Sequence, residues 1–246
     1  MVDFSRNRVH SFMASLMARG EFNSTVFVVD DDASVRKALA RLLASAGYTV
    51  ETFASAREFL DRGHHQDTPG CLVLDISMPG LSGLDLQQEL MAFTPPLPII
   101  FITGHGDIPT SVRAMKGGAV DFLTKPVNDR ELLSLIKLAI ARNVEARKLH
   151  TELQALQQRA ANLTPREREV MLLVVRGRLN KQVADELGTA EKTIKVHRAR
   201  VIEKMGVESL AELVRMAEKL GMFSPETRAG TAPPASATLL PPPPRI

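Results

Sequence analysis

The sequence predicts a chain of two domains: an α/β domain with a doubly wound, five-stranded parallel sheet, and a smaller all-α domain. Strand-like and helix-like segments alternate five times over residues 25–126, which is the pattern of repeated βα units. Residues 128–160 have the pattern of one long helix or of two in tandem, and residues 163–221 that of three or four short helices. A length of 246 residues suffices for two domains of ordinary size.

The first domain follows a regular order of strands and helices. Three strand patterns, at 25–30, 71–75 and 97–103, are nearly continuous apolar runs, as expected for strands that helices cover on both faces. We expect the strand order 2-1-3-4-5, which places the first and third strands side by side. The other expected elements are strands at 48–53 and 119–124 and helices at 33–46, 55–61, 83–92 and 109–116.

A helical segment connects the two domains. Asn128 and Glu131 have the spacing of a capping box, which marks the start of a helix. From Ala146 onward, apolar residues recur at alternating steps of three and four, a heptad-like spacing over about two heptads. Two interpretations stay open, a linker helix with one apolar face or a seam between two copies of the chain. The apolar positions are 146, 149, 153, 156 and 160.

The second domain begins with a strong helix start. Thr164, Pro165 and Glu167 combine a cap, a proline in the first turn and a capping box. Helix patterns at 180–187 and 191–205 flank a turn at 188–189, and a last helix is expected at 209–220. Along the whole chain we expect a flexible extension (1–24), the α/β core (25–127), its last helix and the linker helix (128–161), the helical domain (162–223) and a disordered proline-rich tail (224–246).

Composition excludes several classes of protein. No apolar run reaches the roughly 18–20 residues of a membrane-spanning helix, and the N-terminal residues do not form a clean signal peptide. A single cysteine, Cys71, excludes an internal disulfide and a cysteine-based zinc site. Aromatic residues make up 4% of the chain, which argues against binding of single strands by base stacking. We therefore expect a cytoplasmic protein with no membrane partner.

Charge is divided unevenly between the two domains. Residues 25–126 carry 8 Lys and Arg against 12 Asp and Glu, a net charge of −4. Residues 163–223 carry 12 against 9, a net charge of +3. An acidic first domain and a basic second domain indicate different partners, although a mild basic excess is weak evidence for DNA binding.

Acidic residues follow two strands that are expected to be neighbours. Asp30 and Asp31 end the first strand pattern and Asp75 ends the third, while Thr103 and Lys125 lie at the ends of the fourth and fifth. Carboxylates this close repel one another, and Mg²⁺ together with a lysine would relieve the repulsion. This set suits transfer of a phosphoryl group to an aspartate, with the metal and the lysine neutralising the phosphoryl oxygens.

Four segments resemble the characteristic segments of a two-component receiver domain: VVDDD, LDISMPGLSG, FITGHGD and DFLTKP. The resemblance covers about residues 24–142. It implies that Asp75 accepts the phosphoryl group. It also implies that Asp31 and Asp75 bind Mg²⁺ through carboxylates, Ser77 through its carbonyl and Asp30 through water. Further implied roles are a switch hydroxyl for Thr103, an aromatic switch for Phe122, a phosphoryl contact for Lys125 and a cis peptide bond before Pro126. Asp32 departs from the pattern as an extra acid.

The basic domain has the order of a helix-turn-helix, whose second helix enters the major groove. Ile194, Val201, Ile202 and Met205 can form its buried face. Lys195, Val196 and Ala199 then form a plausible row facing the bases. The segment LTPREREVMLLVVRGRLNKQVADELGTAEKTIKVHRARVIEKMGV resembles the LuxR-type DNA-binding domain over about residues 160–222. That resemblance implies phosphate contacts for Asn180, Lys181, Lys192, Thr193, His197 and Arg198, and pairing on DNA through residues 208–220.

The order of the two domains, the TGHGD segment and the long connecting helix resemble the FixJ type of response regulator. The resemblance implies a transcriptional regulator, not an enzyme, that a sensor histidine kinase phosphorylates with Mg²⁺ as cofactor. Activated receivers would pair through residues 109–116 and 119–124 and bind double-stranded promoter DNA as a homodimer, with RNA polymerase as a further candidate partner. One alternative is a constitutive DNA-binding regulator whose receiver only docks or dimerises. Another is a phosphatase that uses Asp75, for which the sequence offers no positioned acid or base.

Overall fold

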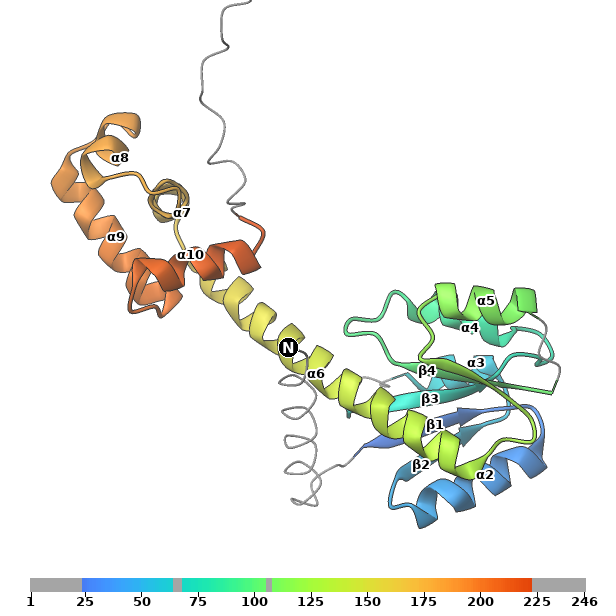
Figure 1. Cartoon of the computed structure of the whole chain (residues 1–246). Coiled ribbons are helices and arrows are strands. Elements are labelled where there is room, and N and C mark those ends of the chain that lie inside the picture. The colour runs from blue at the N-terminus through green and yellow to red at the C-terminus, as the bar shows by residue number, and fades with distance from the viewer. Residues whose placement is uncertain (1–23, 64–67, 105–107, 223–246) are drawn as a thin grey trace, which may run out of the picture. The chain divides into compact units, whose positions relative to one another are not determined.

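The computed structural model describes residues 24–63, 68–104 and 108–222 (Figure 1). The chain divides into two compact units, Met1–Thr151 and Glu152–Ile246, and each is described by itself. The predicted N-terminal extension and proline-rich tail lie outside the described residues, apart from Ser24.

The first unit contains a five-stranded parallel sheet in the order β2-β1-β3-β4-β5, so the predicted α/β fold and strand order are confirmed. The carboxyl ends of β1, β3, β4 and β5 therefore lie along one edge, where Asp75 is opposite Ile102 and Thr103 is opposite Thr124. The strands are Thr25–Val29 (β1), Thr49–Phe53 (β2), Gly70–Asp75 (β3), Ile99–Thr103 (β4) and Asp121–Thr124 (β5).

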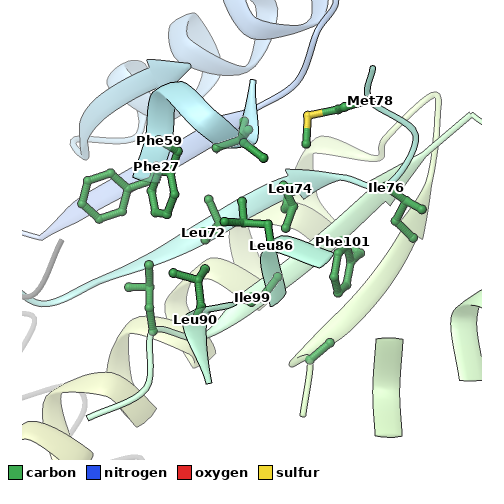
Figure 2. Close-up of a cluster of buried hydrophobic side chains, with 14 of the residues drawn as sticks. Phe27, Phe59, Leu72, Leu74, Ile76, Met78, Leu86, Leu90, Ile99 and Phe101 are labelled. Carbon is green, nitrogen blue, oxygen red and sulfur yellow. The ribbon is translucent and has the colours of Figure 1, made fainter. Parts of the chain in front are cut away.

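Helices cover both faces of the sheet (Figure 1). On one face, α3, α4 and α5 pack against a core that includes Phe27, Leu74 and Phe101 (Figure 2). On the other face, α2 and the start of α6 pack against Val26 and Val28. Because alternate residues of β1 enter opposite cores, the apolar runs in the sequence correspond to strands buried on both sides. The helices are Ala33–Ser45 (α2), Ala56–Arg62 (α3), Gly83–Leu90 (α4), Ile108–Lys116 (α5) and Asp129–Ala161 (α6).

Several elements begin later than predicted, because the residues expected at their starts form hydrogen bonds with neighbouring elements or cap a helix. The fifth strand was expected from 119, but the Ala119 N–H donates to the Ala114 carbonyl and closes the end of α5. The second predicted helix included Ser55, whose side chain instead caps α3 by accepting from the Glu58 N–H. Such residues satisfy the groups that a helix end leaves unpaired, so they flank the element.

The connecting segment is one helix, α6, and not two in tandem. The Asn128 side chain accepts from the N–H groups of Arg130 and Glu131, which confirms the predicted helix start. Further along α6, the Asn143 side chain is 2% exposed and joins two strand ends. Its Oδ1 accepts from the Gly70 N–H at 3.1 Å, and its Nδ2 donates to the Pro96 carbonyl at 3.1 Å. This amide therefore attaches α6 to the starts of β3 and β4.

In the described part of the second unit, four helices follow the end of α6 and pack around their own core. Thr164 and the Glu167 side chain form the predicted capping box at the start of the first. Ile194, Val201 and Met205 are buried, and Ile202 is partly buried against the same core, as predicted. The helices are Pro165–Val175 (α7), Asn180–Glu186 (α8), Glu191–Met205 (α9) and Leu210–Lys219 (α10).

The apolar row near the end of α6 is only partly available to another chain. Leu149 is 54% exposed, whereas Leu156 and Ala160 are buried. Ala160 belongs to the core of the second unit. The last part of the predicted heptad-like row therefore packs within the chain itself. Among the residues that the structure describes, no helix is long and apolar enough to cross a membrane.

We predict that Asn143→Ala destabilises the α/β unit by about 2 kcal/mol, because it leaves the buried Gly70 N–H without a partner and removes the hydrogen bond to the Pro96 carbonyl. The chain has one tyrosine and no tryptophan, and Tyr48 packs against the α/β core. Tyrosine fluorescence during urea unfolding therefore measures the stability of this unit. Lys148→Ala, at an exposed position on the same helix, is the control. Equal midpoints for the two variants would contradict the prediction.

Candidate functional site

Three carboxylates meet at the carboxyl edge of the sheet. Asp30 and Asp31 directly follow β1, and Asp75 is the last residue of β3. Because β1 and β3 are adjacent, one ligand oxygen from each of the three side chains lies within 4.8 Å of the others. Asp30 and Asp75 are buried, and Asp31 is exposed. The structure thus brings together the three acids that the sequence placed at neighbouring strand ends.

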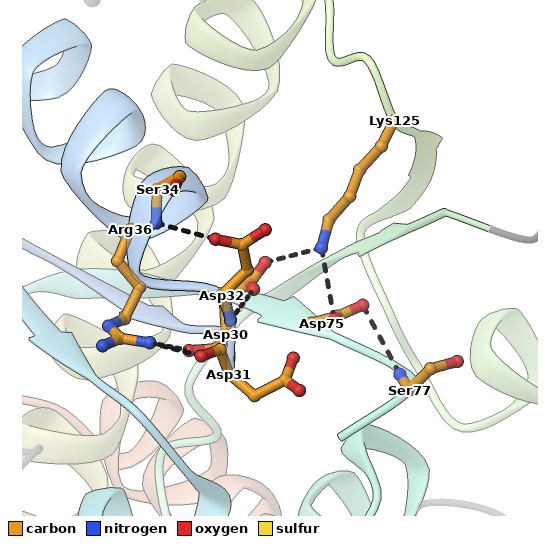
Figure 3. Close-up of polar contacts among 8 residues, drawn as sticks. All are labelled: Asp30, Asp31, Asp32, Ser34, Arg36, Asp75, Ser77 and Lys125. Carbon is orange, nitrogen blue, oxygen red and sulfur yellow. Dashed lines mark hydrogen bonds and ion pairs between the residues drawn. The ribbon is translucent and has the colours of Figure 1, made fainter. Parts of the chain in front are cut away.

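Lys125 joins the two buried carboxylates (Figure 3). Its Nζ lies 2.7 Å from Asp30 Oδ2 and 3.2 Å from Asp75 Oδ2. Burial lowers the pKa of Lys125, but the hydrogen bonds and charges of the two aspartates outweigh this effect and raise the pKa above its ordinary value. The ammonium group is therefore held in its charged form. The peptide bond between Lys125 and Pro126 is cis, as the resemblance implied.

Asp75 experiences opposing electrostatic effects. Burial raises the pKa of its carboxyl group, and the nearby charge of Asp30 acts in the same direction. The charge and hydrogen bond of Lys125 lower the pKa of Asp75 and so oppose both. The net effect raises the pKa of Asp75 above its ordinary value, and the positive charge of Lys125 limits this rise.

The donor set fits a hard divalent cation. Three ionised carboxylates and one ammonium leave a net charge of −2, which a divalent ion would balance. All the candidate ligands are oxygens, which Mg²⁺ prefers, and the exposed position of Asp31 leaves room for water on the ion. Asp31 and Asp75 are the side chains best placed to hold such an ion, because Asp31 is exposed and the contact of Asp75 with Lys125 is longer than that of Asp30, 3.2 Å against 2.7 Å.

The other predicted site residues lie around this cluster. The Ser77 N–H lies 3.4 Å from Asp75 Oδ1, while the role expected for the Ser77 carbonyl stays a prediction. Thr103 ends β4 and is fully buried. Phe122 lies on β5, partly buried against the core of Figure 2. Their expected switch roles also stay predictions.

Two residues of this site had no role assigned from the sequence (Figure 3). The extra acid Asp32 caps α2, because its Oδ1 accepts from the Ser34 N–H at 2.7 Å. This hydrogen bond lowers the pKa of Asp32, and the position of an acid directly before a helical pattern could have revealed the cap. Arg36 donates from Nη1 to the carbonyl oxygens of Asp30 and Asp31, at 2.7 and 2.9 Å. No pattern in the sequence indicates that contact.

The second unit presents a helix-turn-helix in α8 and α9. Gly188 has a φ of +62°, which glycine adopts without strain, and it ends α8 so that α9 can begin at Glu191. Of the predicted DNA-binding residues, the exposed ones are Lys181, Lys192, Thr193, Lys195, Val196 and Ala199, and the partly buried ones are Asn180, His197 and Arg198.

Two polar contacts order this surface. Arg198 Nη1 donates to Asn180 Oδ1 at 3.1 Å and so joins α9 to the start of α8. Lys195 forms an ion pair with Glu191 at 3.1 Å, one turn earlier in α9. In contrast, Nδ1 of His197 is buried without a hydrogen-bond partner among the described residues. The partly buried ring makes His197 less accessible to a ligand than Lys195 or Val196.

An ion pair between a partly buried lysine and a buried glutamate attaches α9 to the start of α7. Lys204 Nζ lies 2.6 Å from Glu167 Oε2 and also donates to the Asn162 carbonyl at 3.1 Å. Arg159 Nη1 donates to the Met205 carbonyl at 3.3 Å, at the end of α9. Glu167 is 2% exposed, and the hydrogen bond from Lys204 holds its pKa at about 2. These contacts attach α9 to the end of α6 and the start of α7.

A doubly wound sheet with an acidic cluster at its carboxyl edge, followed by a helix-turn-helix, defines a two-domain regulatory protein. Residues 26–137 match the family model of the response regulator receiver domain, and residues 161–217 match that of bacterial regulatory proteins of the luxR family. The chain belongs to the response regulators with a LuxR-type DNA-binding domain, the FixJ type. This is a family of transcriptional regulators and not a class of enzymes.

Named relatives align along both domains. Nodulation protein W of Bradyrhizobium diazoefficiens is 52% identical over 202 residues, which cover 82% of this chain and 88% of that protein. Transcriptional regulatory protein FixJ of the same organism is 45% identical over 199 residues, 81% of this chain and 97% of that protein. The solved structure of the response regulator StyR has 50% sequence identity and a TM-score of 0.72, and the match covers 80% of this chain and 99% of that one.

We predict that Glu167→Gln removes a pH-dependent part of the stability of the helical unit. The pKa of Glu167 is about 2 in the folded chain and 4.5 ordinarily, so between these values the unfolded chain binds more protons. The stabilisation by Glu167 is therefore complete above about pH 5 and is lost as the pH falls through the folded pKa.

Amide hydrogen exchange in α7 and α9 measures this effect. The difference in protection between wild type and Glu167→Gln should be largest near neutral pH and disappear in acid. Glu169→Gln, an exposed position on the same helix, is the control and should show no such difference. A difference that does not change with pH would show that the ion pair is not its source.

Proposed function

We propose that the chain is a phosphorylation-activated transcriptional regulator of a two-component system, in which Asp75 accepts a phosphoryl group from a sensor histidine kinase. The observation that carries this proposal is the pairing of Asp75 with Lys125 beside Asp30 and Asp31. A carboxylate at the end of a strand, beside an ammonium group that can neutralise phosphoryl oxygens, is suited to act as a nucleophile toward phosphorus.

The proposed reaction forms one bond and breaks one. A carboxylate oxygen of Asp75 attacks the phosphorus of a phosphohistidine or a small acyl phosphate, and the bond from phosphorus to the donor breaks, with its electron pair leaving on the donor. Lys125 then moves its hydrogen bond from Asp75 to a phosphoryl oxygen. Asp31, Asp75 and the Ser77 carbonyl would hold Mg²⁺, with Asp30 acting through water, and the ion would neutralise further phosphoryl charge. No ATP-binding glycine motif is present in the sequence, so the donor is external.

The proposed switch uses residues next to the modified aspartate. A phosphoryl group on Asp75 offers new acceptor oxygens, to which the Thr103 hydroxyl can donate. Phe122 on the adjacent strand is partly buried and can turn further inward when Thr103 moves. The two side chains thereby link the charge at the site to the position of β5 and α5.

The proposed dimer forms through α5 and β5. Ile108, Val112 and Met115 are 79%, 43% and 44% exposed and lie at helical spacing on one side of α5. An exposed apolar row of this kind is typical of an association surface. Pairing of two receivers raises the effective concentration of the second DNA-binding domain, and two-fold symmetry favours an operator with an inverted repeat.

The proposed DNA contacts lie on α8 and α9. Lys195, Val196 and Ala199 are exposed on one side of α9 and are assigned to the bases of promoter DNA. The residues assigned to phosphates are Asn180, Lys181, Lys192, Thr193, His197 and Arg198. RNA polymerase is a further partner that such a regulator could contact.

One alternative function has the same fold. In it the chain binds DNA constitutively, and the receiver serves only for docking or dimerisation. The complete acidic cluster and its lysine favour the phosphorylated form, because these buried charges cost stability in a domain that only docks.

We predict that Asp75→Asn abolishes phosphorylation. After incubation with Mg²⁺ and acetyl phosphate, intact mass should show one added phosphoryl group on the wild type and none on this variant. Asp85→Asn, which changes a capping carboxylate on α4, is the control and should still be modified. If the wild type gains no phosphoryl group from acetyl phosphate or from a kinase and does not bind beryllofluoride, the alternative function holds.

We predict that Val112→Glu prevents dimerisation without affecting modification. A charge placed within an apolar contact would raise the dimer dissociation constant at least about tenfold, because its burial is costly. Sedimentation of the beryllofluoride-bound protein measures this constant. Lys37→Glu, at an exposed position on α2, is the charge control. Equal dimer dissociation constants in the two variants would show that the dimer contact does not include α5.

A further inference from the structure

Arg36 holds the turn that carries two of the three acids. Its Nη1 donates to the carbonyl oxygens of both Asp30 and Asp31 (Figure 3). The turn runs from the end of β1 to the start of α2, and Arg36 reaches back to it from the fourth residue of the helix. Because the guanidinium group binds two successive carbonyl oxygens, it restricts the backbone of Asp30 and Asp31.

The two acids differ in how their side chains are held. The Asp30 carboxylate is fully buried and accepts from Lys125 through Oδ2 and from the Asp32 N–H through Oδ1. The Asp31 carboxylate is exposed and has no hydrogen bond or ion pair within the described residues. Two neighbouring carboxylates repel it, and only its own backbone keeps it beside them. The position of Asp31 therefore depends on the contacts that hold the turn.

Arg36 adds little to the stability of its own helix. A positive charge near the start of a helix is opposed by the helix dipole, which favours negative charge there. Across residues 24–63, 68–104 and 108–222, no carboxylate lies within ion-pair distance of Arg36. Its described polar contacts are those with the two carbonyl oxygens, so the side chain is directed to the acidic turn.

We propose that Arg36 is a positioning residue that orients Asp31 for binding of Mg²⁺. This inference rests on the proposed function, since it concerns the same site. Arg36 keeps the turn in one conformation while the site is empty of cations and the carboxylates repel one another. Without Arg36, the Asp31 side chain can turn toward water. Binding of Mg²⁺ must then first return Asp31 to its position beside Asp30 and Asp75, which lowers the affinity. Groups that orient metal ligands in this way typically change metal affinity by about 10- to 100-fold.

The test compares Arg36→Met with Arg41→Met. Both changes remove a guanidinium group from α2, but Arg41 is exposed and makes none of the contacts to the turn. Calorimetric titration with Mg²⁺ should give a dissociation constant about tenfold higher for Arg36→Met and an unchanged one for Arg41→Met. The rate of phosphorylation by acetyl phosphate should show a higher half-saturating Mg²⁺ concentration but the same maximal rate. A merely structural role would not separate these two quantities.

Unchanged Mg²⁺ affinity in folded Arg36→Met would overturn the inference, as would an equal change in Arg41→Met. Tyr48 fluorescence during urea unfolding establishes whether the variant is folded. If Arg36→Met does not fold, Arg36→Lys is measured instead. Lysine keeps the positive charge but can donate to only one of the two carbonyl oxygens. An intermediate Mg²⁺ affinity would then support the inference, and wild-type affinity would overturn it. Failure of the proposed function is recognised separately, because then the wild type itself binds no Mg²⁺ and gains no phosphoryl group.

Discussion

The α/β unit depends on a balance of charge at one edge of its sheet. Two buried carboxylates share the ammonium group of Lys125, and a third carboxylate lies beside them. The parallel sheet creates this arrangement, because it brings the ends of β1, β3 and β5 to the same side. The same apolar strands bury Asp30 and Asp75, and this burial raises the free energy of their charged carboxylates. One ammonium group does not neutralise three carboxylates, and this residual negative charge favours a cation at the site.

The second unit contains an ion pair with a structural role. Glu167 and Lys204 are paired to each other, and their remaining polar contacts go to the backbone. The pair therefore joins α9 to the start of α7. Other positive charges among the described residues of this unit lie on exposed parts of α8 and α9, such as Lys181 and Lys192. The two units thus differ in charge balance, because the first groups three carboxylates around one ammonium and the second pairs one carboxylate with one ammonium.

The parts of the fold that could be predicted are those with a periodic or local signal. Apolar runs predicted the strands, helical spacing and capping boxes predicted the helices, and acids at successive strand ends predicted the cluster around Asp75. Contacts between distant residues gave no such signal. Asn143 bonds to Gly70 and Pro96 across 73 and 47 positions, and nothing local marks an asparagine that will be buried. Arg36 is close in sequence to Asp30, yet the direction of a long side chain is decided only when the turn has formed.

The end of α6 belongs physically to the DNA-binding unit. Ala160 fills its core, Arg159 binds the last carbonyl of α9, and the Asn162 carbonyl receives Lys204. The luxR family match begins at residue 161, after two of these three residues. A hybrid regulator joined at that boundary would carry the recognition helix but lose the groups that support its far end. The natural point for exchanging receivers between such proteins therefore lies inside the connecting helix, before Glu152. The boundary between the two units of this chain is set by side-chain packing and not by the start of the family match.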